Sequence, residues 1–251
     1  MALVLSGPEL GRQQVLLEYY RRLLAELGPQ GWWPARTRLE VILGAILVQN
    51  TAWENARQAL ARLRQAGLLS LPRLRRLPGL ELQEYIRPAG FYRQKARTIR
   101  GFLDWLGKHH GWSLDRLFQR PAGEVRQELL SLKGLGLETV DAILLYAGRQ
   151  PWFVADAYTR RILARHELVP ATDGYATVQE FLHQHLPADH RLYNEYHALL
   201  VEVGKRHCRN AAPRCDECPL RDFLPAPSLT VAITATAPGL RSRTSTRPSA
   251  S

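Results

Sequence analysis

The stretch LKGLGLETVDAILLYAGRQPWFVADAYTRRILAR, residues 132–165, decides the fold. Gly134 and Gly136 interrupt a helical pattern at a spacing too short for a helix to continue, and apolar positions then return at helical period. The pattern predicts a helix, a hairpin that carries both glycines, and a second helix. Backbone N–H groups without a neighbouring Cβ can approach a ligand closely, and beside a helix N-terminus that ligand is most often a phosphate. From the glycine spacing alone, an ordinary tight turn between two helices is an equally good interpretation.

The remaining sequence also predicts helices. No stretch alternates apolar and polar residues over more than a few positions, as a half-buried strand would. Pro121 is a suitable start for the helix that leads into the hairpin. The sequence therefore predicts an all-α fold. Helical periodicity covers residues 8–27, 38–48, 53–66, 72–86, 96–109, 157–166, 176–186 and 190–206.

The charge balance indicates a polyanionic partner. The chain of 251 residues has 34 Lys and Arg against 23 Asp and Glu, a formal net charge of +11. Such a balance favours nucleic acid over a membrane surface, although an arginine-rich surface without a specific partner is an alternative. No basic segment precedes an apolar run at the N-terminus, and no stretch reaches the roughly 20 apolar residues of a membrane span. We therefore expect a cytoplasmic, nucleoid-associated protein, a monomer without a membrane partner.

The cysteines are few and close together. Cys208, Cys215 and Cys218 are the only three in the chain. An odd number bunched in this way argues against a disulfide framework and for metal or cluster ligation in a reducing compartment. From Pro225 to Ser251 the composition becomes rich in Ala, Pro, Ser and Thr with no acidic residue, which predicts a disordered tail over residues 225–251.

Four features follow one another along the chain: the Gln49-Asn50-Thr51 stretch, the hairpin Leu132–Gly136, Asp156 in Phe153-Val154-Ala155-Asp156-Ala157, and the cysteine cluster. In this order they resemble the helix-hairpin-helix (HhH-GPD) DNA glycosylase superfamily, of the endonuclease III group, over about residues 30–222. The resemblance implies two lobes. Residues 30–150 would form a six-helix barrel with the hairpin, and residues 1–29 and 151–224 a second lobe with an iron–sulfur-type cysteine loop.

The resemblance implies that Asp156 is catalytic, stabilising positive charge on the sugar or activating a water molecule. An N-cap for the following helix is the plainer interpretation of Asp156, and both roles can hold at once. Bifunctional family members carry a lysine two residues past the second hairpin glycine, where this chain has Glu138. A carboxylate cannot form an imine, so the resemblance implies base removal by water.

The segment Trp32-Trp33-Pro34 resembles the 3-methyladenine DNA glycosylase III branch, in which such an element lies by the base pocket, and Trp53 falls where that branch has a pocket aromatic. An indole face suits a cationic alkylated purine. Gln49 matches the glutamine that fills the gap left by the extruded nucleotide. Packing against the core for the tryptophans and a helix C-terminal cap for Gln49 are the plainer alternatives.

Several residues are candidates for contacts with the DNA backbone. The resemblance implies such contacts for the hairpin and the first turn after it. The basic residues Arg93, Lys95 and Arg97 could rest on the backbone or form a solvated face. The hairpin candidates are Lys133, Gly134, Leu135, Gly136 and Thr139.

The spacing Cys208-x6-Cys215-x2-Cys218 reproduces the first three ligands of the family's [4Fe–4S] motif. The fourth cysteine is expected at position 224, but that residue is Leu224. Four thiolates are the usual set. Asp222 could complete the set, the cluster could be incomplete or labile, or the end of the chain could be altered.

Together these features predict a monofunctional DNA glycosylase of base-excision repair. It would bind damaged double-stranded DNA, flip out an alkylated purine such as 3-methyladenine, and hydrolyse its N-glycosidic bond. One alternative is an endonuclease III-like glycosylase and AP lyase that acts on oxidised pyrimidines with a lysine from elsewhere. An alternative of another class is a non-catalytic DNA-binding or damage-sensing module.

Overall fold

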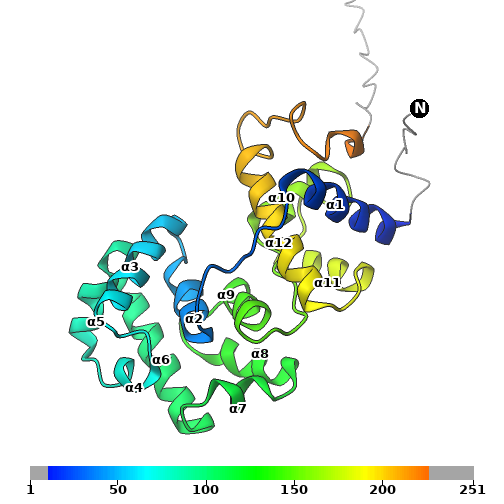
Figure 1. Ribbon diagram of the computed structural model, residues 1–251. Coiled ribbons are helices and arrows are strands. Elements are labelled where there is room, and N and C mark those ends of the chain that lie inside the picture. The colour runs from blue at the N-terminus through cyan, green and yellow to red at the C-terminus, as the bar shows by residue number, and fades with distance from the viewer. Residues whose placement is uncertain (1–10, 226–251) are drawn as a thin grey trace, which may run out of the picture.

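The computed structural model describes residues 11–225, and within that range the secondary structure is entirely helical. The all-α prediction is therefore confirmed. The helices gather in two groups, α2–α9 in one and α1 with α10–α12 in the other (Figure 1). The predicted tail at 226–251 lies outside the described residues. In the described part of the chain, no helix combines the length and the apolar character needed to cross a bilayer.

The first group begins with α2, after the chain has passed over from α1 of the other group, and ends in a π-helix. Within it, α2 packs on α3, α6, α9 and η2 and so forms the centre of the group. Its elements are α2 (Arg38–Leu47), α3 (Trp53–Gln65), α4 (Leu71–Leu74), α5 (Gly79–Ile86), η1 (Arg87–Ala89), α6 (Tyr92–His110), α7 (Leu114–Phe118), α8 (Ala122–Ser131), α9 (Leu137–Ala142) and η2 (Ile143–Ala147).

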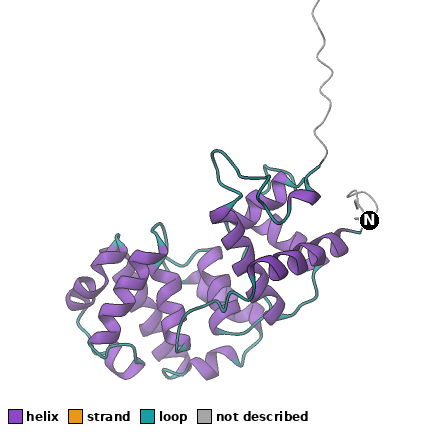
Figure 2. Cartoon of the chain, turned by 45° about the horizontal axis from the view of Figure 1, so that its top comes forward, coloured by secondary structure: helices purple, strands orange, loops and turns teal. Residues whose placement is uncertain are grey.

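The second group brings together both ends of the described chain. Here α12 packs against α10 and α1, and it also contacts η2 of the first group. Figure 2 shows that the loops run over the outside of the helices in both groups. The elements are α1 (Arg12–Leu27), α10 (Ala157–Arg165), α11 (Tyr175–His185), α12 (His190–Arg206) and η3 (Arg221–Phe223). The predicted boundaries at residues 30 and 150 stay a prediction.

Helix α2 is central because its sequence has no polar face. Every residue from Leu39 to Leu47 is buried. Thr37 caps the helix, its hydroxyl accepting a hydrogen bond from the Glu40 backbone N–H at 3.2 Å. The buried Glu40 carboxylate in turn accepts from the Arg36 N–H at 2.6 Å, so a charged side chain is satisfied inside the core.

The hairpin joins α8 to α9 as the glycine pattern predicted. Gly134 has φ +92°, and a Cβ there would lie 2.1 Å from the Thr98 Oγ1, so the fold itself requires glycine at this position. Leu135 points into the core and is only 5% exposed. Gly136 caps α9 and faces open space, because nothing lies within 4 Å of where its Cβ would be.

One buried carboxylate ties the hairpin helix to the second group. Asp141, fully buried on α9, accepts two hydrogen bonds from Arg126 of α8, at 2.6 and 3.1 Å. It also accepts from Gln179 Nε2 at 2.7 Å and from the Tyr175 hydroxyl at 2.8 Å, both on α11. A network of this kind, with the charge paired on both sides, fixes α9 relative to α11.

The structure departs from the predicted helices in one clear place. Residues 72–86 were predicted as one helix but form α4 and α5, separated by a turn. Pro78 has no N–H to donate and disfavours helical backbone at Leu77 before it, which ends the first helix. Arg100 of α6 then satisfies the free carbonyls of Arg75 and Leu77, at 3.1 and 2.9 Å.

Candidate active site

A cavity of about 490 Å³ lies where the two groups of helices meet. Its wall contains every residue that the sequence assigned to the catalytic pair and to the base pocket. A volume of this size is in the range of small-molecule and base-binding sites. Side chains that contribute to the wall are Gln30, Trp32, Trp33, Gln49, Asn50, Thr51, Trp53, Glu138, Thr139, Asp156, Tyr158, His197, Glu202 and Lys205.

Three indoles form one side of the cavity. Trp32 and Trp33 come from the segment between α1 and α2, and Trp53 is the first residue of α3. The ring centroids of Trp32 and Trp53 lie 4.9 Å apart and those of Trp33 and Trp53 5.2 Å apart, both in edge-to-face arrangements. Trp33 also lies against Gly44 of α2, where a Cβ would be 3.0 Å from the indole. All three rings are half-buried, so they pack on the core and still border the cavity.

Asp156 is the N-cap of α10 and is only 8% exposed. Its Oδ1 accepts a hydrogen bond from the Thr159 N–H at 2.8 Å, and its Oδ2 lies 3.6 Å from the Nε2 of His197 on α12. Burial raises the pKa of Asp156, but the contacts with His197 and Thr159 outweigh it, so the pKa lies below its ordinary value. The capping interpretation is thus confirmed, and the carboxylate is held ionised inside the cavity.

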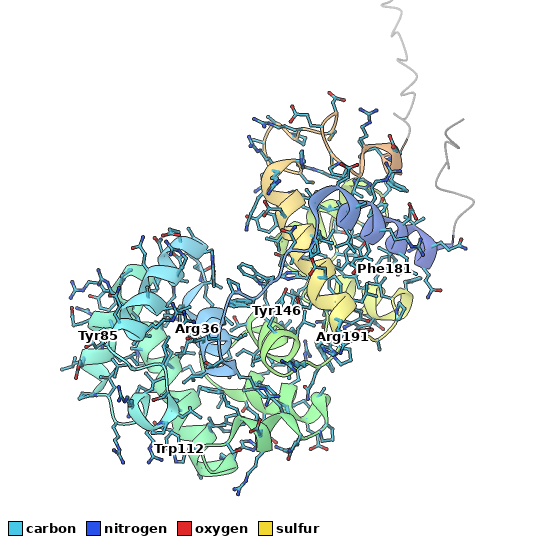
Figure 3. All side chains as sticks on the ribbon, in the orientation of Figure 1. Arg36, Tyr85, Trp112, Tyr146, Phe181 and Arg191 are labelled. Carbon is cyan, nitrogen blue, oxygen red and sulfur yellow. The ribbon has the colours of Figure 1, made fainter. Side chains whose placement is uncertain are left out.

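His197 is itself held from behind. Its Nδ1 is hydrogen-bonded to the hydroxyl of Tyr146, which belongs to the π-helix η2. Figure 3 shows Tyr146 at the meeting point of the two groups of helices. A π-helix is rare and usually marks a functional position. The chain Tyr146–His197–Asp156 therefore links the hairpin helix, α12 and α10 at one point.

Glu138 lies in the first turn of α9 and borders the same cavity. More than a third of the residue remains exposed, which places it at the rim. Desolvation, followed by the nearby Asp156 carboxylate, raises the pKa of Glu138 above its ordinary value of 4.5. The two carboxylates thus face one cavity with pKa values shifted in opposite directions.

Gln49 follows α2 and reaches across to the hairpin. Its Nε2 donates to the Gly134 carbonyl at 3.1 Å and to the Thr139 hydroxyl at 2.9 Å. Thr139 is buried, whereas Lys133 and Gly136 are exposed on the hairpin. The hairpin thus presents one lysine and one unobstructed glycine to solvent, while its other predicted contact residues also serve internal packing.

Among the residues that sequence reasoning missed are His197 and Lys205 in the cavity wall, and Tyr146, which lies behind His197 and outside that wall. Tyr146 and His197 occur in helices whose apolar pattern gives them no distinction from core residues. Lys205, near the end of α12, is exposed and borders the cavity, although it lies 67 positions from Glu138 in the sequence. No local pattern in the sequence identifies these residues as part of the site, because their positions depend on how distant helices pack together.

Some basic residues proved to be structural. Lys95 is 4% exposed, and its Nζ donates to the carbonyls of Leu47 and Ala89 at 2.9 and 2.7 Å. Lys95 is therefore available neither for the DNA backbone nor for a solvated basic face, because its ammonium group is buried and bonded to protein carbonyls beneath α6. Arg161 similarly donates to the Cys208 carbonyl at 2.7 Å and anchors the cysteine loop on α10.

The three cysteines line a second, narrow cavity, which Leu224 also borders. Within residues 11–225, no group of three or more His, Cys, Asp or Glu side chains could hold a single metal ion. The donors nevertheless suit an iron–sulfur cluster, whose iron atoms each take one thiolate at separate corners. Asp222 does not complete the set, because it lies outside this cavity and pairs with Arg22 at 3.2 Å.

Comparison with known proteins agrees with this geometry. Residues 43–188 match the family model of the HhH-GPD superfamily base excision DNA repair protein. A Methanocaldococcus jannaschii protein named as a DNA repair glycosylase is 39% identical over 211 residues, 84% of this chain and 96% of that protein. Endonuclease III of Sulfolobus acidocaldarius is 26% identical over 75% of this chain and 82% of its own length.

Solved structures give the same picture. A non-covalent endonuclease III–DNA complex superimposes with a TM-score of 0.72 over 86% of this chain and 95% of that one, at 22% identity, which shows the fold. H. pylori 3-methyladenine DNA glycosylase bound to 1,N6-ethenoadenine gives a TM-score of 0.67 at 27% identity, over 78% of this chain and 98% of that one. The resemblance read from the hairpin and Asp156 is confirmed: the chain is a DNA repair glycosylase that belongs to the HhH-GPD superfamily of base excision DNA repair proteins.

Proposed function

We propose that the protein is a monofunctional glycosylase that removes an alkylated, positively charged purine, of the 3-methyladenine type, from double-stranded DNA. The observation that carries the proposal is the composition of the 490 Å³ cavity, whose wall combines three indoles with the carboxylates of Asp156, Glu138 and Glu202, the last paired with Arg206. Indole faces and carboxylates both attract a cation, and the indole faces do so without forming hydrogen bonds to the base. Similarity to the H. pylori 3-methyladenine glycosylase supports the same substrate class.

The proposed chemistry follows from Asp156 and Glu138, the two carboxylates whose pKa values are shifted in opposite directions. The bond between C1′ and the base nitrogen breaks, its electron pair neutralises the departing cationic base, and positive charge develops on the sugar. The lowered pKa of Asp156 makes it a weak proton acceptor and a permanent negative charge, which suits stabilisation of that sugar cation. The raised pKa of Glu138 makes it the better acceptor for the proton of the water that adds to C1′.

Recognition of DNA is proposed for the exposed side of the hairpin. Lys133, Gly136 and the start of α9 would contact backbone phosphates, while Gln49 would occupy the space of the extruded nucleotide. The net charge of +11 supports an affinity that falls steeply with salt.

A second candidate, a glycosylase with AP lyase activity, has one observation in its favour. Lys205 borders the cavity that holds Asp156, so an amine is present although position 138 carries a carboxylate. Attack of that amine on C1′ would give a Schiff base that borohydride reduces to a covalent adduct.

The test is base release from methylated duplex DNA, with the freed bases identified and borohydride trapping run in parallel. We expect release of methylated purines and no adduct, with wild type and Lys205→Ala alike. An adduct that Lys205→Ala abolishes would establish the second candidate. DNA binding without base release from methylated or oxidised duplexes would instead leave a damage-sensing module.

A further inference from the structure

The cysteine cavity contains three cysteines, one fewer than the family's cluster motif expects. Cys208, Cys215 and Cys218 border it together, and Leu224 stands where the motif spacing expects the fourth thiolate. All three cysteines therefore share one narrow cavity, as the ligands of a single cluster must.

His207 borders the same cavity and has a nitrogen without a partner. Its Nδ1 is buried and finds no hydrogen bond in the described part of the chain. Its backbone is fixed, because it ends α12 with its N–H on the Val203 carbonyl at 2.8 Å. Its carbonyl accepts the N–H groups of Arg209 and Arg214, both at 2.9 Å, so the cysteine loop is folded around this residue.

The other candidate donors near the cavity each have at least one partner. His166 also borders it, but its Nδ1 is bonded to the Tyr19 hydroxyl at 2.8 Å. Asp222 lies outside and pairs with Arg22 and Arg221. Burying an imidazole nitrogen without a hydrogen-bond partner destabilises the fold. The unpaired Nδ1 of His207 therefore calls for an explanation, and a bound ligand would supply one.

We propose that the Nδ1 of His207 is the fourth ligand of a [4Fe–4S] cluster whose other three ligands are Cys208, Cys215 and Cys218. Imidazole ligation of an iron–sulfur centre is established chemistry, since histidines replace two cysteines in Rieske centres. The Nη1 of Arg165 lies 3.2 Å from the Cys208 Sγ and would donate a hydrogen bond to a ligand sulfur. This inference does not depend on the proposed substrate.

The experiment compares five proteins after anaerobic reconstitution with iron and sulfide: wild type, His207→Ala, His207→Cys, His207→Ala/Leu224→Cys and the control His109→Ala, whose histidine is exposed on α6. Iron and sulfide content, visible absorption and circular dichroism are measured on each. Reduced samples labelled with 15N-histidine are examined by pulsed EPR for a nitrogen bound to iron.

We expect about four irons per chain in wild type and His109→Ala, with a strong histidine nitrogen coupling. His207→Ala should lose at least a quarter of its iron, while His207→Cys and the double variant regain it without the nitrogen coupling. The proposal is overturned if wild type binds no cluster, if it binds zinc instead, or if His207→Ala keeps both its iron and the coupling. Recovery of iron in the double variant separates ligand loss from misfolding.

Discussion

The base cavity and the cysteine cavity differ in which parts of the chain form them. The base cavity is assembled from distant segments: Asp156 accepts a hydrogen bond from Thr159 and lies 3.6 Å from the His197 Nε2, and Gln49 is bonded to the Gly134 carbonyl. The cysteine cavity is formed by the cysteine loop and the C-terminal ends of α10 and α12, and His207, whose buried Nδ1 has no hydrogen-bond partner in the described residues, borders it. The first cavity suits a substrate that binds and leaves, whereas the proposed cluster would be a resident group of the second.

The largest expected effect breaks the first cavity and leaves the second intact. Asp156→Asn should lower single-turnover base release about 10³-fold, the range typical for loss of a charge-stabilising group. Asn is as good an N-cap as Asp, so the melting temperature and the iron content should not change. Release at the wild-type rate would exclude a catalytic role for this carboxylate.

The converse change breaks the second cavity and leaves the first. Cys208→Ser should lower the free energy of unfolding by more than about 2 kcal/mol, as expected when a buried ligand set is lost. Base release at saturating protein should stay within about threefold of wild type, because Cys208 does not border the base cavity. Thermal unfolding and single-turnover kinetics on the same preparation separate the two effects. A large loss of release rate in a folded, DNA-saturated sample would contradict the separation.

A third change sharpens the description of the base cavity. His197→Gln removes a contact that lowers the pKa of Asp156, so burial then raises that pKa. Because the ionised form is active and is lost as pH falls through the pKa, the acid limb of the rate should move to higher pH by about one unit. We expect a rate loss of about tenfold at neutral pH as well.

The pH profile should be measured in a Glu138→Gln background, since the raised pKa of Glu138 would otherwise place its own inflection above pH 4.5. Tyr146→Phe keeps His197 but removes its hydrogen-bond partner. This variant should move the acid limb of the pH–rate profile to higher pH as well, by a smaller amount than His197→Gln does. An unchanged limb in both variants would mean that His197 has no influence on Asp156.

The smallest expected effect concerns selectivity. Trp53→Ala removes one indole from the wall and should reduce release of cationic methylated purines about fivefold to tenfold, the range of a partly desolvated cation–π contact. Release of a neutral base from a mismatched or deaminated site, where detectable, should fall less. Equal losses for charged and neutral bases would indicate that Trp53 contributes shape alone.

The parts of the molecule that sequence could predict are those carried by local pattern. Gly134 and Gly136 marked the hairpin and Asp156 the start of a helix, because each depends on residue type and short spacing, whereas the tryptophans were assigned to the base wall through the family resemblance. Lys95, His197 and His207 could not be interpreted in this way. Lys95 donates to two carbonyls beneath α6, His197 lies against a carboxylate on α10, and His207 borders a cavity that α10 also lines, so these positions depend on how the helices pack.

The hydrogen bonds of Gln49 have a consequence for how the proposed glycosylase would reject undamaged nucleotides. In the free protein both of its amide hydrogens are engaged, by Gly134 of the hairpin and Thr139 of α9, so the proposed insertion into a duplex would first break two hydrogen bonds. Their net loss amounts to roughly 1–3 kcal/mol, an energetic cost that would be the same at every nucleotide. Under the proposed role, weakly stacked or mispaired nucleotides would repay this cost most easily, and discrimination would begin before any base reached the indoles.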